Sequence, residues 1–111
     1  MVRPTEFKIT QRATEGGVSL KITGELDLST GPALKESVDR LRRGATELTV
    51  DLSDLMFMDS TGLRLLIELD QRAKQEHWKL ALVRPKYETA DAVLRATGAD
   101  KALPFGEAPN S

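Results

Sequence analysis

One stripe of apolar residues in the second half of the chain constrains the fold most. Its members recur at i, i+3, i+4, i+7 and i+11, and they are Gly62, Leu65, Leu66, Leu69 and Ala73. This spacing places side chains on one face of an α-helix. The residues between them are polar: Arg64, Glu68, Gln71, Arg72 and Gln75. The pattern predicts an amphipathic helix that begins near Asp59 and must lie against a hydrophobic surface.

Stretches with period-two alternation can supply that surface. Val18, Leu20 and Ile22 alternate with polar residues after a glycine turn, and the same alternation returns around Val50 and Leu82. Such alternation is typical of strands with one buried face. We expect strands over 6–12, 18–23, 47–52 and 78–83, of which the first two form a hairpin. A short edge strand over 102–105 is optional.

Two further helices are expected on capping and spacing signals. Ser29-Thr30-Gly31-Pro32 combines helix N-cap residues with a proline, and a basic last turn follows before Gly44. A third helix runs over 87–96 and ends at Thr97-Gly98, while 55–58 is expected to be an apolar connection. The order is β-β-α-β-α-β-α, with an optional last strand. It predicts an α/β fold with a mixed sheet of four to five strands and helices packed against it.

The length and composition exclude several classes of protein. With 111 residues the chain is long enough for one domain over 1–111, with a core over about 6–105 and a flexible tail over 106–111. Sixteen basic and seventeen acidic residues give a net charge of -1, which does not suit a nucleic-acid binder. Zero cysteines fit a reducing cytoplasm, and no apolar run is long enough for membrane insertion.

Catalysis is not expected from this sequence. His77 is the single histidine, so it has no second histidine with which to share a metal ion, and we expect it at a solvated helix end. No glycine-rich loop has the spacing of a dinucleotide or phosphate site. We therefore predict no enzyme, no catalytic residues, no metal and no cofactor.

Asp59-Ser60-Thr61-Gly62 at the start of the amphipathic helix has two interpretations. Asp, Ser and Thr are favoured N-cap residues, because their side-chain oxygens accept from the free amides of the first turn. Alternatively, a serine hydroxyl held at a helix start is a phosphorylation site. A phosphate there adds about -1.5 to -2 charges, which the helix dipole tolerates and a docked acidic partner would not.

The sequence around this segment resembles a known family. Residues 51–63, Asp-Leu-Ser-Asp-Leu-Met-Phe-Met-Asp-Ser-Thr-Gly-Leu, closely resemble the central signature of the STAS domain, in particular that of the bacterial anti-sigma factor antagonists. Gly24-Glu25-Leu26-Asp27 and the segment 97–104 are similar to two other parts of the family pattern. The resemblance spans about Phe7 to Phe105.

The resemblance implies a binding regulator. Unphosphorylated, such an antagonist binds an anti-sigma factor that is also a serine-protein kinase and so releases a sigma factor; a serine phosphatase reverses the modification. The phosphorylated serine maps to Ser60, and Thr61 is a secondary candidate. The partner-binding residues expected on this basis and from the helix pattern are Asp27, Asp59, Ser60, Thr61, Gly62, Leu63, Arg64 and Ile67. We expect a cytoplasmic monomer with transient partners.

Two other functions fit the same fold. The chain could be a non-enzymatic scaffold subunit of a lipid-transport or signalling complex, or a module that binds a small ligand such as a nucleotide or lipid. Leu63 and Ile67 fit a partner contact and a buried core equally well. For Met56, Phe57 and Met58, packing within a core loop is the preferred interpretation.

Overall fold

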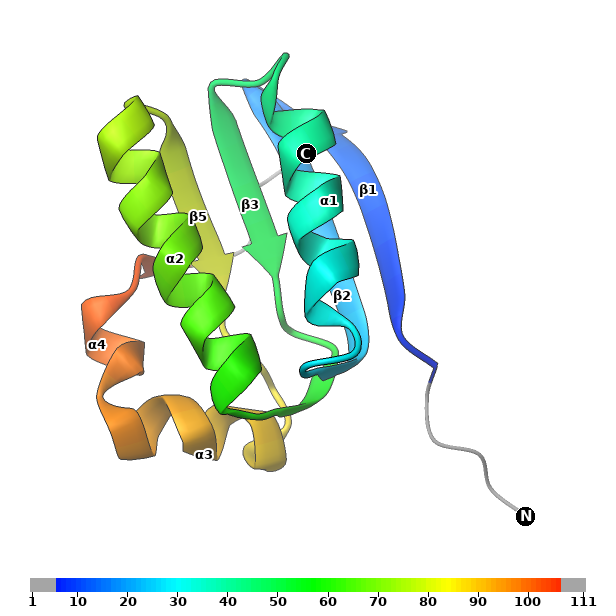
Figure 1. Cartoon of the computed structure of the whole chain (residues 1–111), viewed down its shortest axis with the longest axis vertical. Coiled ribbons are helices and arrows are strands. Elements are labelled where there is room, and N and C mark those ends of the chain that lie inside the picture. The colour runs from blue at the N-terminus through cyan, green and yellow to red at the C-terminus, as the bar shows by residue number, and fades with distance from the viewer. Residues whose placement is uncertain (1–5, 107–111) are drawn as a thin grey trace.

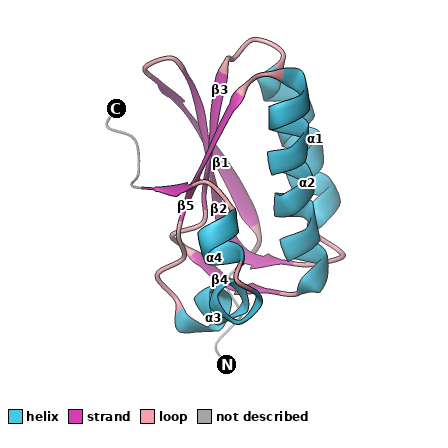
Figure 2. Cartoon of the chain, turned by 90° about the vertical axis from the view of Figure 1, so that its left-hand side faces the viewer, coloured by secondary structure: helices cyan, strands magenta, loops and turns pink. Residues whose placement is uncertain are grey.

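The computed structural model describes residues 6–106, which form one mixed sheet with helices against one face and at one end (Figures 1 and 2). The strands are β1 (Lys8–Thr14), β2 (Gly17–Leu26), β3 (Glu47–Asp51), β4 (Leu55–Met58), β5 (Lys79–Val83) and β6 (Phe105–Gly106). The helices are α1 (Gly31–Arg42), α2 (Ser60–Glu76), α3 (Glu88–Thr97) and α4 (Ala99–Ala102).

The long strand β2 organises the sheet. It pairs antiparallel with β1, as the glycine turn predicts, and the sheet order is β1-β2-β3-β5-β6. The first half of β2, from Gly17 to Lys21, pairs in parallel with β3. Its second half, from Gly24 to Leu26, pairs in parallel with β4. The carboxyl end of β2 is thereby brought beside the chain segment that leads into α2.

Helices α1 and α2 cover one face of the sheet (Figure 2). The five residues of the predicted α2 stripe are all buried, which confirms the helix face that the spacing indicates. They pack against the inward-facing residues of the central strands, among them Leu20, Ile22 and Val50, each fully buried. On α1 the buried apolar residues are Leu34 and Val38.

The sheet has six strands rather than the predicted four to five, and two elements were not expected. The segment 55–58, predicted as a connection, is strand β4. It lacks strict alternation because its two end residues, Leu55 and Met58, are the buried ones. The four-residue helix α4 precedes β6, and Gly106 belongs to β6 rather than to the predicted tail. Residues 107–111 of that tail lie outside the described residues.

The ends of α2 follow the predictions for its flanking residues. His77 is exposed and ends the helix in the left-handed conformation, with φ 61°. Trp78, next in the chain, is buried, and the Arg42 guanidinium lies 5.5 Å from the centre of its ring. Within residues 6–106 no helix combines the length and the apolar character needed to cross a bilayer.

Candidate functional site

Asp59 caps the start of α2. Its backbone is extended, with φ -100° and ψ -173°, and its Oδ1 accepts a hydrogen bond of 3.0 Å from the Gly62 amide. The Asp59 carbonyl oxygen accepts from the Leu63 amide at 3.0 Å. The capping interpretation of this segment is therefore confirmed, and the cap is the aspartate.

Ser60 is the first residue of α2 and is exposed. Because Asp59 supplies the cap, the Ser60 hydroxyl is not used in holding the helix end, and its side chain makes no hydrogen bond within residues 6–106. The hydroxyl therefore stands at the solvent boundary beside the amides of the first helical turn, where a negative charge is electrostatically favoured.

Gly62 is buried, unlike its neighbour Ser60. A Cβ at this position would lie 2.5 Å from the Leu26 carbonyl oxygen and 2.9 Å from the Met58 Cγ. The absence of a side chain lets the first turn of α2 approach the end of β2. Gly62 is thus enclosed by packing in the free chain, and a partner contact at this residue stays a prediction.

Asp27 organises the loop between β2 and α1. Its Oδ1 accepts hydrogen bonds from the Ser29 hydroxyl at 2.8 Å, the Ser29 amide at 3.0 Å and the Thr30 amide at 3.2 Å. The bond from the Ser29 hydroxyl, aided by those from Thr30, holds the pKa of Asp27 below its ordinary value. The Thr30 hydroxyl accepts from the Asp27 amide at 2.9 Å. The carboxylate predicted to face a partner thus also fixes its own loop.

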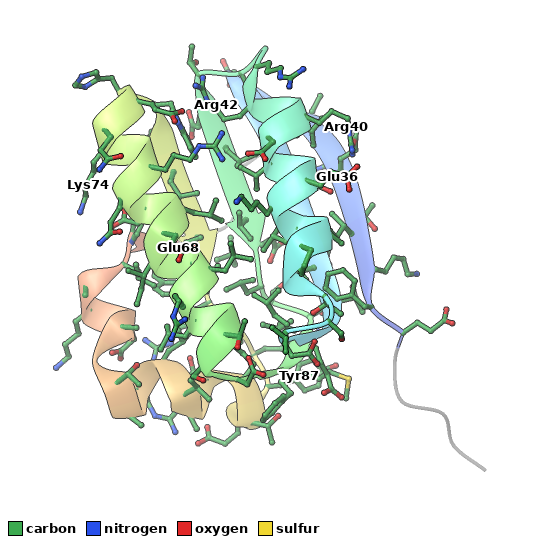
Figure 3. All side chains as sticks on the ribbon, in the orientation of Figure 1. Glu36, Arg40, Arg42, Glu68, Lys74 and Tyr87 are labelled. Atoms are coloured by element: carbon green, nitrogen blue, oxygen red, sulfur yellow. The ribbon has the colours of Figure 1, made fainter. Side chains whose placement is uncertain are left out.

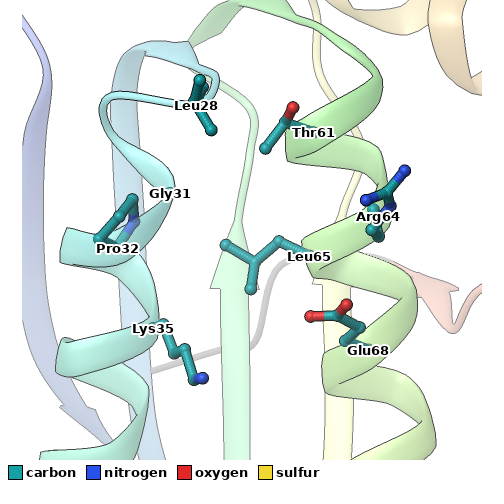
Figure 4. A pocket seen from close by; sticks show the side chains of 8 residues that line it. All are labelled: Leu28, Gly31, Pro32, Lys35, Thr61, Arg64, Leu65 and Glu68. Atoms are coloured by element: carbon teal, nitrogen blue, oxygen red, sulfur yellow. The ribbon is translucent and has the colours of Figure 1, made fainter.

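A groove of about 430 Å³ lies between α1 and α2 beside this loop (Figure 4). Its lining residues are Leu28, Gly31, Pro32, Lys35, Thr61, Arg64, Leu65 and Glu68. Leu28 and Thr61 lie on opposite sides of one end, and the charged side chains of Lys35, Arg64 and Glu68 flank the apolar part. We call this the α1–α2 groove. It adjoins Ser60 through the next residue, Thr61.

Leu63 and Ile67 are the remaining predicted partner residues on α2. Leu63 is buried and Ile67 is 37% exposed. Both line a second cavity, of about 300 Å³, whose other wall comes from Gly98 to Leu103 around α4. Thr61 and Arg64 therefore line the α1–α2 groove, whereas Leu63 and Ile67 line the second cavity. Ser60 lies three residues before Leu63 and four before Arg64, on the side of α2 that these residues share.

Exposed apolar side chains gather at the end of the molecule where α2 begins. Leu28 is 75% exposed, Phe57 41% and Tyr87 38%. Phe57 lies in β4, and Tyr87 is the N-cap of α3, a helix that packs against β4 at this end (Figures 1 and 3). The prediction that 56–58 packs within the core is correct for Met58, which is buried, and wrong for Phe57.

Sequence reasoning missed several residues of this surface. Leu28, Pro32, Lys35 and Glu68 belong to the α1–α2 groove, and Phe57 and Tyr87 are exposed near it. Only Leu28 carries a local signal, as an apolar residue in a polar turn. Among the described residues, no three His, Asp or Glu side chains are grouped so that they could hold a metal ion.

Comparison with known proteins places this geometry in a family. A family model described as "Mlab, STAS domain" matches residues 9–104. Over 71 residues the chain is 30% identical to the anti-sigma-B factor antagonist of Bacillus subtilis, covering 64% of this chain and 65% of that protein. Over 76 residues it is 33% identical to the anti-sigma-F factor antagonist RsfB of Mycobacterium tuberculosis, covering 68% of this chain and 62% of that protein. The matches thus span less than two thirds of each relative.

Solved structures share the fold. An anti-sigma factor antagonist from Mycobacterium paratuberculosis aligns with a TM-score of 0.81 at 23% identity, over 97% of this chain and 92% of that one. The Bacillus cell fate determinant SpoIIAA in its phosphorylated form aligns with a TM-score of 0.66 at 20% identity, over 95% of this chain and 93% of that one. With a family model matching nearly the whole described chain, this protein belongs to the STAS domain family.

Proposed function

We propose that this chain is an anti-sigma factor antagonist regulated at Ser60. In the unmodified state it binds a kinase-type anti-sigma factor, which then releases its sigma factor. The kinase transfers the γ-phosphoryl group of ATP to the Ser60 oxygen, with loss of the hydroxyl proton and release of ADP, and the complex separates. A serine phosphatase restores the hydroxyl by hydrolysis. The chain itself performs no catalytic step, and the exchange takes place in the cytoplasm, where RNA polymerase works.

One observation carries the proposal: the Ser60 hydroxyl is exposed while the neighbouring Asp59 carboxylate holds the helix end. A kinase can therefore modify Ser60 without removing the cap. The relatives named as anti-sigma factor antagonists and the solved phosphorylated SpoIIAA support the same role.

The surface around Ser60 suits a protein contact. Leu28 and Phe57 offer exposed apolar side chains, and the α1–α2 groove offers a concave apolar strip with charges beside it. We propose that the partner covers Asp59, Ser60, Thr61 and Arg64 together with this groove. Asp27 contributes by fixing the loop that carries Leu28.

Electrostatics explain how one phosphate can end such a contact. At the helix start the added charge stabilises the carrier by about 0.3–1 kcal/mol, so the fold survives. A partner carboxylate ~5 Å from a phosphate of about two charges meets a repulsion of roughly 2–6 kcal/mol at effective dielectric constants of 80 to 20. Because each ~1.4 kcal/mol is tenfold in affinity, the loss is about 30-fold or more.

Incubation with the cognate anti-sigma kinase and ATP, followed by mass spectrometry of the peptides, tests this function. We expect phosphate on Ser60 in the parent, none on the Ser60→Ala variant, and phosphate still on Ser60 in the Thr61→Val variant. Phosphate on Thr61 alone would move the switch to the secondary candidate. An absence of phosphate, together with co-purification of a transporter ATPase, would instead support the scaffold function. Calorimetric binding of a nucleotide or lipid would support the ligand-binding module.

A further inference from the structure

Arg64 stands one helical turn after Ser60. The i, i+4 spacing puts both side chains on the same side of α2, with their Cβ atoms about 5–6 Å apart. Helical side chains lean toward the N-terminus, and Figure 4 shows the Arg64 guanidinium pointing to the end of α2 that holds Thr61. The guanidinium is therefore within reach of a group attached to the Ser60 oxygen.

Arg64 also differs from the other basic residues of α2. Arg72 pairs with Asp39 and Glu76, and Lys74 pairs with Asp70. Arg64 is exposed and makes no ion pair with any residue between 6 and 106. Its i+4 neighbour, Glu68, forms no such pair with it, and a basic residue placed before an acidic one is the weaker order for an i, i+4 pair.

We propose that Arg64 is the internal counter-ion of a phosphoryl group on Ser60. The inference rests on the proposed phosphorylation of Ser60. An anionic group four residues before a cation is the favourable order on a helix, and guanidinium–phosphate hydrogen bonds are among the strong ones in proteins. The pair closes across one turn of α2 without any change of backbone.

With this ion pair, phosphorylation of Ser60 changes the charge of the α1–α2 groove as well as that of Ser60 itself. Arg64 is part of the wall of the α1–α2 groove, where its guanidinium is available to a partner carboxylate. When the phosphoryl group draws it toward Ser60, the groove loses that cation and keeps Lys35 and Glu68. Phosphorylation then adds an anion at the contact and withdraws a cation from it.

The pair can be tested on the isolated chain with phosphoserine incorporated at position 60 during translation. The second pKa of the phosphate, about 6 in the absence of a partner, is followed by phosphorus NMR as the pH is varied. A paired guanidinium favours the dianion. We expect the phosphate pKa to be about 0.3 higher in Arg64→Gln than in the parent, and Arg64→Lys to restore part of the difference.

Arg40→Gln is the matched control. Arg40 is an exposed arginine on α1 at the end of the molecule far from the first turn of α2 (Figure 3). Removing its charge should leave the phosphate pKa unchanged. Equal pKa values in the parent and Arg64→Gln, or an equal rise in Arg40→Gln, would overturn the pair. Because no kinase is involved, that result would leave the proposed function standing, whereas an unlabelled Ser60 in the kinase assay would overturn the function alone.

Discussion

Asp59 and Ser60 are neighbours with different roles at the start of α2. The aspartate accepts from the Gly62 amide and so closes the helix end, while the serine hydroxyl stays exposed. Had the serine been the cap, its modification would have removed the bond that starts the helix. The separation of cap and hydroxyl is what allows a modification here to change binding and leave the fold intact.

Two substitutions of Asp59 distinguish the effect of its capping hydrogen bond from the effect of its charge. Asp59→Ala should lower the free energy of unfolding by about 1 kcal/mol, because an orphan amide of the first turn loses its acceptor. Asp59→Asn keeps an oxygen in the same place and should lose far less. Urea denaturation of the three proteins measures both effects. Equal losses in the two variants would show that the carboxylate charge, rather than the cap, stabilises the helix start.

Local patterns predict site residues that lie close together in the sequence, whereas the prediction of Asp27 depends on the resemblance to the STAS family. Asp59, Ser60, Thr61 and Arg64 lie within six consecutive residues and are predicted by pattern and resemblance. Lys35 is not predicted by either, because only the packing of α1 beside α2 brings it to Arg64 and Glu68. The sequence leaves Leu63 open between core and surface because a helix on a sheet can bury a wide face, and the structure shows it buried.

At the scale of elements, the close approach of α2 to β2 places Ser60 at the edge of the α1–α2 groove. Gly62→Ala should destabilise the chain by about 1–3 kcal/mol, because the new methyl group would lie 2.5 Å from the Leu26 carbonyl oxygen. Gly44→Ala is the control, since a Cβ there meets no atom within 4 Å. Chemical denaturation of both variants measures the difference. A change within about 0.5 kcal/mol for Gly62→Ala would contradict the tight packing.

The elements differ in how well the sequence predicts them. Helix α2 was predicted correctly because its stripe continues over several turns, and β2 because its alternation is strict. Strand β4 is not predicted because its four residues are all apolar and show no alternation with polar residues. Their pairing with Gly24–Leu26 makes them a strand. Helix α4 is a single turn and is defined by its packing after Gly98. Short elements are decided by tertiary contacts, which local patterns do not contain.

At the scale of the whole molecule, ion pairs join α3 and α4 to the end of β5. The Arg84 Nε lies 2.5 Å from Asp91 Oδ1, and its Nη2 lies 3.2 Å from Asp100 Oδ2. Asp91 also binds Arg95 at 2.6 Å. The hydrogen bond from Arg84, with help from Arg95, lowers the pKa of Asp91 below its ordinary value of 3.8. These contacts fix α3 beside β4 at the end of the molecule that carries Ser60.

The lowered pKa of Asp91 gives stability a defined pH dependence. The Asp91 carboxylate binds a proton more readily in the unfolded chain than in the folded one. Its contribution to the free energy of unfolding is therefore complete above the pKa of the unfolded chain, about 4, and is lost as the pH falls through the lower pKa of the folded chain. Asp91→Asn should therefore lose about 1–2 kcal/mol at pH 7, and the two stability curves should converge toward pH 2. Urea denaturation across pH 2–7 measures both curves. Glu15→Gln, a variant in an exposed turn, is the control, and its curve of stability against pH should run parallel to that of the parent. A difference between Asp91→Asn and the parent that stays constant with pH would contradict the assignment of this pH dependence to Asp91.

The proposed regulation depends on the affinity of the whole chain for its partner. The direct measurement is calorimetry of the cognate anti-sigma factor with three forms: the unmodified chain, the form with phosphoserine at position 60, and Ser60→Ala. We predict tight binding by the first and third forms and a loss of about 30-fold or more for the phosphoserine form. Equal affinity of the phosphorylated and unmodified chains would contradict the account.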